Sequence, residues 1–287
     1  PIILPLVGDL YRNDDEKTSS CLGIIETSNT FGKVLSPILG SLFAAVLWFI
    51  PFFSISFFSL IAIVLVIFFI KVPKEREKPK KFKEFLKMTK QTFKDEGKWL
   101  FVVFLLGAFV MLVLFAVLFF LSDYLEKTHG IKGVKKGFVL AIPLLVLCIS
   151  SFITGKKIKG SISAMKKINI VSLIILSASV AGIGYTKDKL VFLLVVASVM
   201  GLAIGTMLPA LDALITENIQ KGERGTITSF YSSARFIGVA AGPPIMTVVI
   251  KNYLNISLIS VGVLGLLLLM LVFKFIKADA SKTEKAA

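Results

Sequence analysis

Two copies of one short stretch decide the fold of this chain: Gly32-Lys-Val-Leu-Ser-Pro-Ile-Leu-Gly-Ser41 and, 206 positions later, Gly238-Val-Ala-Ala-Gly-Pro-Pro-Ile-Met-Thr247. Each copy has a glycine five residues before a proline, and each lies in an apolar run long enough to cross a bilayer. Further upstream, Pro5-Leu-Val-Gly-Asp9 corresponds to Pro209-Ala-Leu-Asp212. We interpret this pattern as an internal repeat that relates two halves built from membrane helices.

The composition independently indicates a membrane protein, because hydrophobic residues make up 55% of the chain and the mean hydropathy is +0.85. A helix needs ~20 apolar residues to cross the ~30 Å hydrocarbon core. Eight runs meet this length, at about 22–46, 51–72, 99–122, 137–155, 168–186, 189–212, 226–250 and 254–276, and residues 1–10 are expected to end a ninth helix. The expected fold is an all-α integral membrane bundle. Comparison of the halves predicts three helices and most of a fourth upstream, which completes two pseudo-symmetric six-helix halves.

Positive charge alternates between successive loops. Of the 33 lysines and arginines, 24 fall in 12–17, 71–98, 156–167, 221–224 and the segment after 273, whereas the opposite loops hold seven. The positive-inside rule makes the first set cytoplasmic. The net charge of +15 is therefore explained by topology and predicts an anionic inner leaflet as partner rather than nucleic acid.

The sequence contains no pattern for chemistry on a bound cofactor. Cys21 and Cys148 have neither metal-site nor disulfide spacing, and the single histidine, His129, is expected in an outer loop. No phosphate-binding loop, metal-ligand cluster or nucleophile elbow is recognisable. We therefore expect neither an enzyme nor a cofactor or metal, and transport driven by an ion gradient is the remaining interpretation.

The pattern of charge and hydropathy divides the chain into four parts. Residues 1–72 are expected to be the remainder of the N-terminal half, 73–98 a cytoplasmic linker, 99–276 the C-terminal six-helix half and 277–287 a cytoplasmic tail. In the linker, apolar residues at helical spacing lie among lysines, which is typical of a basic amphipathic helix on a membrane surface. A solvated tether that is partly helical is the alternative.

The stretch that begins at Gly32 resembles the antiporter motif on the fifth helix of exporters of the major facilitator superfamily, Gly-x-x-x-Gly-Pro-x-x-Gly-Gly, with serine at the second and fourth glycines. The resemblance covers the whole chain and is strongest to the twelve-helix drug:proton antiporter branch. It implies a major facilitator-type bundle and export coupled to protons. The family's second charged loop is degenerate here, because Gly155-Lys-Lys-Ile-Lys-Gly160 lacks the aspartate.

The motif also predicts packing. Small residues four positions apart allow a neighbouring helix to approach closely, and proline removes a backbone hydrogen bond and favours a kink. We expect the two bent helices, one from each half, to form a gating joint; ordinary helix packing is the alternative. The residues concerned are Gly32, Ser36, Pro37 and Gly40 in the first copy and Gly238, Gly242 and Pro243 in the second.

Charged residues inside the predicted spans are candidates for proton coupling, because an unpaired charge at mid-bilayer costs at least ~2.5–3.5 kcal/mol. Glu26, Asn29 and Lys33 share one helix face at i, i+3 and i+7. Glu26 is either a protonatable group or cationic-substrate anchor, or a hydrated gate residue near the inner surface. Arg235, ~15 Å into its helix by the ~1.5 Å rise, is expected to pair with a carboxylate in the cavity or to be structural.

Asp9 and Asp212 resemble the family's acidic residue that braces a cytoplasmic loop, so we expect them to act as conformational latches, with a solvated helix-end carboxylate as the alternative. Asp212 could pair with the lysines of 156–167.

The spans contain few amides or tryptophans, which favours flat lipophilic compounds over sugars as the cargo. The candidate cavity residues are Phe104, Met111, Met207 and Tyr231.

These observations predict a monomeric, multi-pass exporter of amphiphilic small molecules in the plasma membrane, driven by proton antiport through alternating access. The excess of lysine over arginine suits a low-GC bacterium. Two alternatives remain: a proton-coupled symporter that imports an organic anion, with Arg235 holding the carboxylate, and a non-transporting membrane receptor or scaffold.

Overall fold

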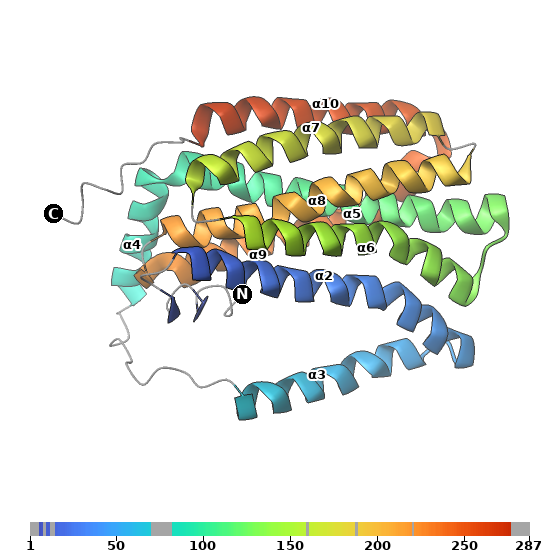
Figure 1. Cartoon of the computed structure of the whole chain (residues 1–287), viewed down its shortest axis with the longest axis horizontal. Helices are drawn as coiled ribbons and strands as arrows, with labels where there is room; N and C mark the ends of the chain where they lie inside the picture. Colours follow the sequence, from blue (N-terminus) through green and yellow to red (C-terminus); the bar gives the residue numbers. More distant parts are fainter. Residues whose placement is uncertain are drawn as a thin grey trace.

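The computed structural model describes residues 6–7, 10–11, 15–69, 82–158, 161–186, 189–219 and 221–276. The helices follow in the order α2 (Asp15–Val46), α3 (Ile50–Phe69), α4 (Phe82–Asp95), α5 (Gly97–His129), α6 (Gly133–Lys157), α7 (Ile162–Thr186), α8 (Leu190–Asn218), α9 (Lys221–Asn252) and α10 (Leu254–Phe275). The long helices run side by side, and α4 lies across their ends (Figure 1).

Among the described residues, seven helices are long and apolar enough to cross a membrane: α3 and α5–α10. The all-α membrane fold expected from the sequence is confirmed. The expected span at 22–46 forms the 32-residue helix α2, but the charge and polar groups along it keep it out of this set. α2 nevertheless belongs to the bundle, because it lies along α6 and α8 and buries Glu26 against protein.

The predicted spans lie within the observed helices except at a few ends, and several helices are longer than their apolar runs. α2 begins at Asp15 rather than near residue 22, and α5 continues to His129 rather than ending near 122. Polar residues at these ends do not interrupt backbone hydrogen bonding, so the helices extend beyond the segment that hydropathy marks. α5 ends where Gly130 adopts φ 63°, a left-handed conformation that favours glycine.

Most of the core lies within the six helices α5–α10, and Leu22 and Val34 of α2 pack into it. Neighbouring pairs in this bundle are α5 with α9, α6 with α8, α7 with α8, and α7 with α10. Fully buried leucines, among them Leu100, Leu106 and Leu114, follow one face of α5 at helical spacing. In contrast, α3 has no buried residue among those described and carries apolar side chains all round, as expected for a helix that faces lipid.

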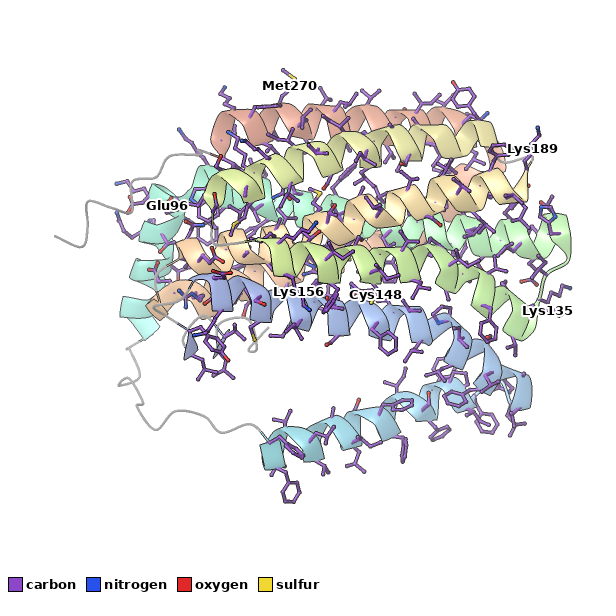
Figure 2. The ribbon with its side chains drawn as sticks, viewed as in Figure 1. Glu96, Lys135, Cys148, Lys156, Lys189 and Met270 are labelled. Atoms are coloured by element: carbon purple, nitrogen blue, oxygen red, sulfur yellow. The ribbon has the colours of Figure 1, made fainter. Side chains whose placement is uncertain are left out.

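The long axis of the bundle has two distinguishable ends. Glu96 and Lys156 lie toward the end that carries α4, and Lys135 and Lys189 lie at the other (Figure 2). α4 and Lys156 belong to the segments with the larger share of lysine and arginine, so α4 lies at the surface that the charge distribution predicts to be cytoplasmic.

The linker helix predicted within 73–98 is present as α4, and its last turn contacts the bundle. The ring of Phe93 meets those of Phe104 in α5 and Phe230 in α9 edge to face, at centroid distances of 6.3 and 5.6 Å. The hydroxyl of Thr92 donates a hydrogen bond to Glu223 of α9. α4 is therefore fastened to both α5 and α9, and its contact with the membrane surface stays a prediction.

α2 and α6 approach each other closely at both ends of their contact. Near one end the backbones of Gly23 and Gly155 meet so tightly that neither position has room for a side chain. Near the other, a β-carbon added at Gly137 would lie 2.6 Å from the carbonyl oxygen of Pro37. Between them, Cys148 directs its Sγ at the carbonyl oxygen of Thr27, 3.6 Å away. Thus α2 lies against α6 along most of its length.

Candidate functional site

Two buried carboxylates and a partly buried guanidinium, from three helices, meet inside the bundle. The guanidinium of Arg235 in α9 donates one hydrogen bond to Glu26 Oε1 in α2, at 3.0 Å, and another to Asp212 Oδ1 in α8, at 3.1 Å. The exposed fractions of the carboxylate side chains are 4% for Glu26 and 0% for Asp212. One guanidinium therefore joins two buried carboxylates, which spares each of them the cost of an unpaired charge.

The remaining polar residues of the predicted α2 face extend this cluster. Asn29 donates a hydrogen bond to Glu26 Oε2 at 3.3 Å, and Lys33 Nζ lies 3.8 Å from Glu26 Oε1. Their spacing at i, i+3 and i+7 places all three on one side of the helix, as expected. When Arg235, Lys33, Glu26 and Asp212 are all charged, the net charge of the cluster is zero.

Tyr231 supports Arg235 from the same helix, one turn earlier. The guanidinium carbon lies 5.5 Å from the centroid of the tyrosine ring, within the range of a cation–π contact. The ring also lies 6.3 Å from that of Phe104. Gly107 of α5 makes room here, because an added β-carbon would lie 2.6 Å from Tyr231 Cε2. Sequence reasoning missed Gly107, although a lone glycine inside an apolar run is a recognisable signal of close approach.

Within the described part of the chain, three polar atoms of this region are buried without a hydrogen-bond partner: Asp212 Oδ2, Tyr231 Oη and Lys33 Nζ. Buried polar atoms of this kind are uncommon and costly. The Tyr231 hydroxyl and the Asp212 carboxylate interact with each other, so Lys33 Nζ is the atom of this region with capacity for a water molecule or a polar group of a ligand. No group of three or more His, Cys, Asp or Glu among the described residues could hold a metal ion.

A cavity of about 330 Å³ adjoins the cluster between α2, α5, α6 and α9. Lys33 is the charged residue in its lining. The remaining lining residues are Ser36, Pro37, Phe115, Leu118, Phe119, Leu140, Leu144 and Pro243. The two halves of the repeat meet here, since Pro37 and Pro243 occupy corresponding positions in the two copies of the motif.

The substrate-cavity candidates proposed from sequence do not line this cavity. Met111, Met207 and Tyr231 are almost completely buried in the helix core, and Phe104 packs against Phe93 and Tyr231. The physical reason is that aromatic and methionine side chains fill the interior of an apolar bundle as readily as they line a lipophilic cavity. Residue type alone does not separate the two environments.

The expected joint between the two motif helices is also wrong in its packing. Added β-carbons at Gly32 and Gly40 would meet no described atom within 4 Å, so the first stripe makes no close helix contact there. Gly238 and Gly242 do make close contacts, but with the backbone of α5 rather than with α2. A β-carbon at Gly242 would lie 2.8 Å from the carbonyl oxygen of Leu112. The main packing partners are α6 for α2 and α5 for α9, and Pro37 lies inside an uninterrupted helix.

Of the two residues predicted to act as latches, Asp9 and Asp212, the structure describes only Asp212. Asp212 pairs with Arg235 rather than with the lysines of 156–167, because its side chain is directed into the bundle and is fully buried there. A solvated helix-end carboxylate is therefore wrong for Asp212. Asp9 lies outside the described residues.

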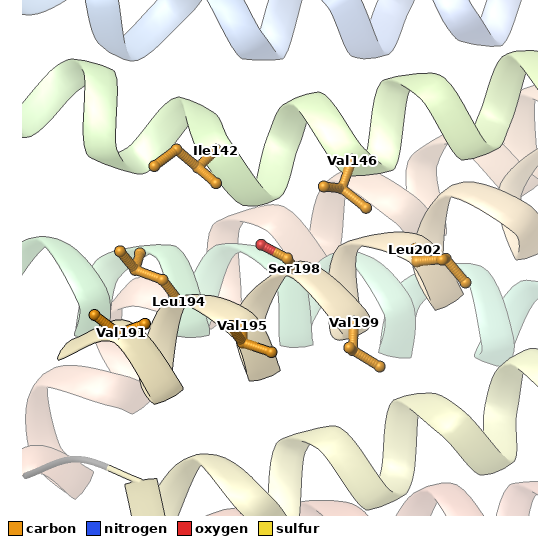
Figure 3. A pocket seen from close by; sticks show the side chains of 8 residues that line it. All are labelled: Ile142, Val146, Val191, Leu194, Val195, Ser198, Val199 and Leu202. Atoms are coloured by element: carbon orange, nitrogen blue, oxygen red, sulfur yellow. The ribbon is translucent and has the colours of Figure 1, made fainter. Parts of the chain in front are cut away.

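A second cavity, of about 340 Å³, lies between α6 and α8. Ile142 and Val146 face it from α6, and residues of α8 from Val191 to Leu202 face it from the other side (Figure 3). Ser198 is the polar residue of the lining, and several lining side chains, including Val191, are exposed on the outside of the bundle. With no charged group in its lining, this groove is less suited to selecting a ligand than the cavity at Lys33.

Comparisons with known proteins agree with this architecture. The sequence model of the Major Facilitator Superfamily matches residues 1–243 and 163–287. The Bacillibactin exporter of Bacillus subtilis (strain 168) is 48% identical over 285 residues, which cover 99% of this chain and 71% of the exporter. Multidrug resistance protein MdtG of Escherichia coli (strain K12 / DH10B) is 26% identical over 243 residues, covering 83% of this chain and 58% of MdtG.

Among solved structures, the human organic anion transporter MFSD10 (TETRAN) superposes with a TM-score of 0.73 at 20% sequence identity. The superposition covers 94% of this chain and 66% of that protein, and at this identity it shows the fold alone. The family match extends over both copies of the motif and over the cavity between them. The chain belongs to the major facilitator superfamily of membrane transporters.

Proposed function

We propose that this chain acts in the export of amphiphilic small molecules across the plasma membrane, by proton antiport with alternating access. One observation carries the proposal: Arg235 joins Glu26 of α2 to Asp212 of α8, so a buried ion-pair cluster links a helix of the first half to two helices of the second. Transporters of this architecture move one half against the other. A link across the halves must therefore change during the cycle.

A proton is a means of changing this link. A guanidinium stays charged at any cellular pH, so the carboxylates are the groups of this cluster that gain or lose charge at Arg235. Protonation of Glu26 removes its ion pair with Arg235 and weakens the connection between α2 and α9. A proton that binds one conformation better than another shifts the equilibrium between them by that difference, typically about 1–3 kcal/mol.

The cavity supports an amphiphilic cargo. Its lining is apolar and aromatic except for Lys33 and Ser36, and its volume of about 330 Å³ is at the lower end of the ~300–1,000 Å³ typical of ligand pockets. The direction of transport is supported by the 48% identity to an exporter. Identity to MdtG is lower and supports multidrug export more weakly.

The test is a flux measurement with purified protein in proteoliposomes that contain a pH-sensitive dye. Antiport predicts proton movement opposite to cargo movement, and Glu26→Gln is expected to abolish proton movement. Glu126→Gln is the matched control, because that carboxylate pairs with Lys136 at the opposite end of the bundle, at 2.7 Å. Cargo flux without proton flux contradicts antiport, and ligand binding without any flux supports a receptor or scaffold instead.

A second candidate, proton-coupled movement of an organic anion, is favoured by a specific observation: the charge in the cavity lining is the ammonium-bearing Lys33. In the same proteoliposomes a symporter moves protons in the direction of the cargo. The sign of the dye response therefore separates the two candidates.

A further inference from the structure

The two cations of the cluster differ in how their charge is satisfied. The guanidinium of Arg235 forms charge-assisted hydrogen bonds to two carboxylates, one from each terminal nitrogen. Lys33 has the weaker arrangement: its Nζ lies 3.8 Å from Glu26 Oε1 and makes no hydrogen bond within the described part of the chain. An ammonium group has three donors to satisfy. Lys33 is thus the cation with free bonding capacity, and Arg235 is not.

The surroundings of Lys33 provide space for a ligand on one side and a carboxylate on the other. Its side chain lines the cavity, whose wall includes Phe115 and Phe119 of α5 and Leu140 of α6, and no carboxylate belongs to that lining. Lysine carries its charge on a flexible four-carbon stem, so a small rotation can redirect Nζ from Glu26 toward the cavity. The Nζ atom itself is buried, so its interaction with a ligand charge is stronger than that of an ammonium in bulk solvent.

We propose that the cavity between α2, α5, α6 and α9 binds amphiphilic anions, whose negative group is held by Lys33 and whose apolar or aromatic body lies against Phe115, Phe119 and Leu140. The inference rests on the proposed transport function, for which it names the cargo class, and it holds for either direction of proton movement. Lys33 thus takes the place of Arg235 as the expected anchor of an anion, because the guanidinium of Arg235 already binds Glu26 and Asp212.

The sign of the ligand charge follows from the lining. A cation placed in this cavity would meet Lys33 before it reached Glu26, whose side chain is only 4% exposed and lies on the far side of the ammonium. A neutral amphiphile would gain the apolar contacts but leave Nζ without a hydrogen bond. An anion satisfies both, and leaves Arg235 and Asn29 to hold Glu26.

The experiment measures binding of three probes that share one bicyclic ring: 2-naphthoate, 2-naphthylmethanol and 2-naphthylmethylammonium. The full chain is placed in nanodiscs of a zwitterionic lipid, so that no anionic lipid competes for Lys33, and binding is followed by calorimetry. We expect 2-naphthoate to bind at least about tenfold more tightly than the alcohol, as for a charge-assisted contact, and the ammonium probe to bind most weakly.

Substitutions at the anchor give the sharper comparison. Lys33→Gln should reduce 2-naphthoate binding to the level of the alcohol, and Lys33→Arg should retain most of it. Lys135→Gln, which removes an exposed charge from the first turn of α6, outside the cavity, should leave it unchanged. Leu140→Trp fills the cavity and should weaken all three probes alike. Equal affinities for the three probes, or full 2-naphthoate binding by Lys33→Gln or by Leu140→Trp, would overturn the inference.

Because Lys33→Gln could also disturb the ion-pair cluster, the thermal unfolding temperature of each variant is measured in the same discs. If Lys33→Gln unfolds early, the probe ranking of the wild-type protein and the effect of Leu140→Trp still decide the question. Flux separates this inference from the proposed function. If the probes bind in a Lys33-dependent way but none is transported, the proposed transport function is wrong and the anion site stands. If all three probes are transported without preference for the anion, the anion site is wrong and the transport function stands.

Discussion

Arg235 Nη2 lies 3.0 Å from Glu26 Oε1, although the two residues are 209 positions apart in the chain. Their helices pack mainly elsewhere, α9 on α5 and α2 on α6, so the two motif-bearing helices meet through side chains rather than through the glycine stripes. An ion pair can be broken by one proton, whereas a tightly packed helix interface cannot. The link between the halves is therefore of a kind that a chemical gradient can control.

Removal of the guanidinium should be more damaging than its replacement by another cation. Arg235→Gln leaves Glu26 and Asp212 buried without their shared partner, and breaking a buried ion pair in this way costs about 3–5 kcal/mol. Arg235→Lys keeps the charge but cannot reach both carboxylates with a rigid fork, so it should retain only part of the stability and of the transport rate. Thermal unfolding in detergent and cargo export from vesicles measure both.

The double variant Arg235→Gln/Asp212→Asn is the control for this interpretation. It removes one buried negative charge together with the positive one, so it should recover much of the lost stability while export stays impaired. If Arg235→Gln alone unfolds at the wild-type temperature, Arg235 does not stabilise the buried carboxylates in the way the distances indicate.

Transport should depend on pH through the same two carboxylates. At low pH a protonated carboxylate no longer pairs with Arg235, and at high pH both remain ionised, so the rate of a proton-coupled cycle changes across the range in which they titrate. Glu26→Gln/Asp212→Asn should remove this dependence. The pH profile of export is recorded for the wild type, for the double variant and for Glu126→Gln, which should keep the wild-type profile. A wild-type profile in the double variant would assign the pH dependence to other groups.

Two glycines of the repeated motif should respond differently to the same substitution. Gly238→Ala places a methyl group against the carbonyl oxygen of Ala108 in α5, and such overpacking costs about 1–3 kcal/mol. Gly32→Ala meets no described atom within 4 Å and should keep or gain stability, by up to ~1 kcal/mol, because alanine favours helix. Unfolding temperatures of the two variants test the packing. Export by a stable Gly32→Ala protein tests separately whether the first stripe has a gating role.

The linker helix should stabilise the bundle through its last turn. Phe93 contacts the rings of Phe104 and Phe230, and each aromatic pair contributes about 0.5–1.5 kcal/mol beyond the area it buries. Phe93→Ala should therefore lower the unfolding temperature, and Thr92→Val, which removes the donor to Glu223 while keeping the shape, should do so by less. Lys90→Ala, an exposed position on the same helix, is the control. Equal unfolding temperatures for Phe93→Ala and Lys90→Ala would mean that α4 is not held by these contacts.

The sequence predicted features whose pattern has a single physical cause. It did not predict which residues contact each other, because contact partners depend on how the helices pack. Repetition of glycine and proline at fixed spacing identified Pro37 and Pro243 as corresponding positions, and both line the cavity. The stripe at Gly32 did not show which way it faces, because small residues permit close approach without naming the neighbour. Likewise, the charge of Arg235 inside a span required a partner, but Glu26 could be assigned only once the helices were placed.

The close contact of Gly23 with Gly155 leads to a test of movement between α2 and α6. Gly155→Leu cannot fit against the backbone of Gly23, so the two helices should separate at that end, and Cys148, which is buried at the same interface with its Sγ 3.6 Å from the Thr27 carbonyl oxygen, should become accessible. In a Cys21→Ser background, labelling of Cys148 by a membrane-permeant maleimide should become severalfold faster. Gly225→Leu, on α9 with open space around the added side chain, is the matched control and should label at the original rate. Transporters of this architecture move one half against the other, and α2 and α6 belong to different halves, so a wedge at this contact should lower export by the unlabelled Gly155→Leu protein. Slow labelling together with full export would mean that the leucine does not separate the two helices.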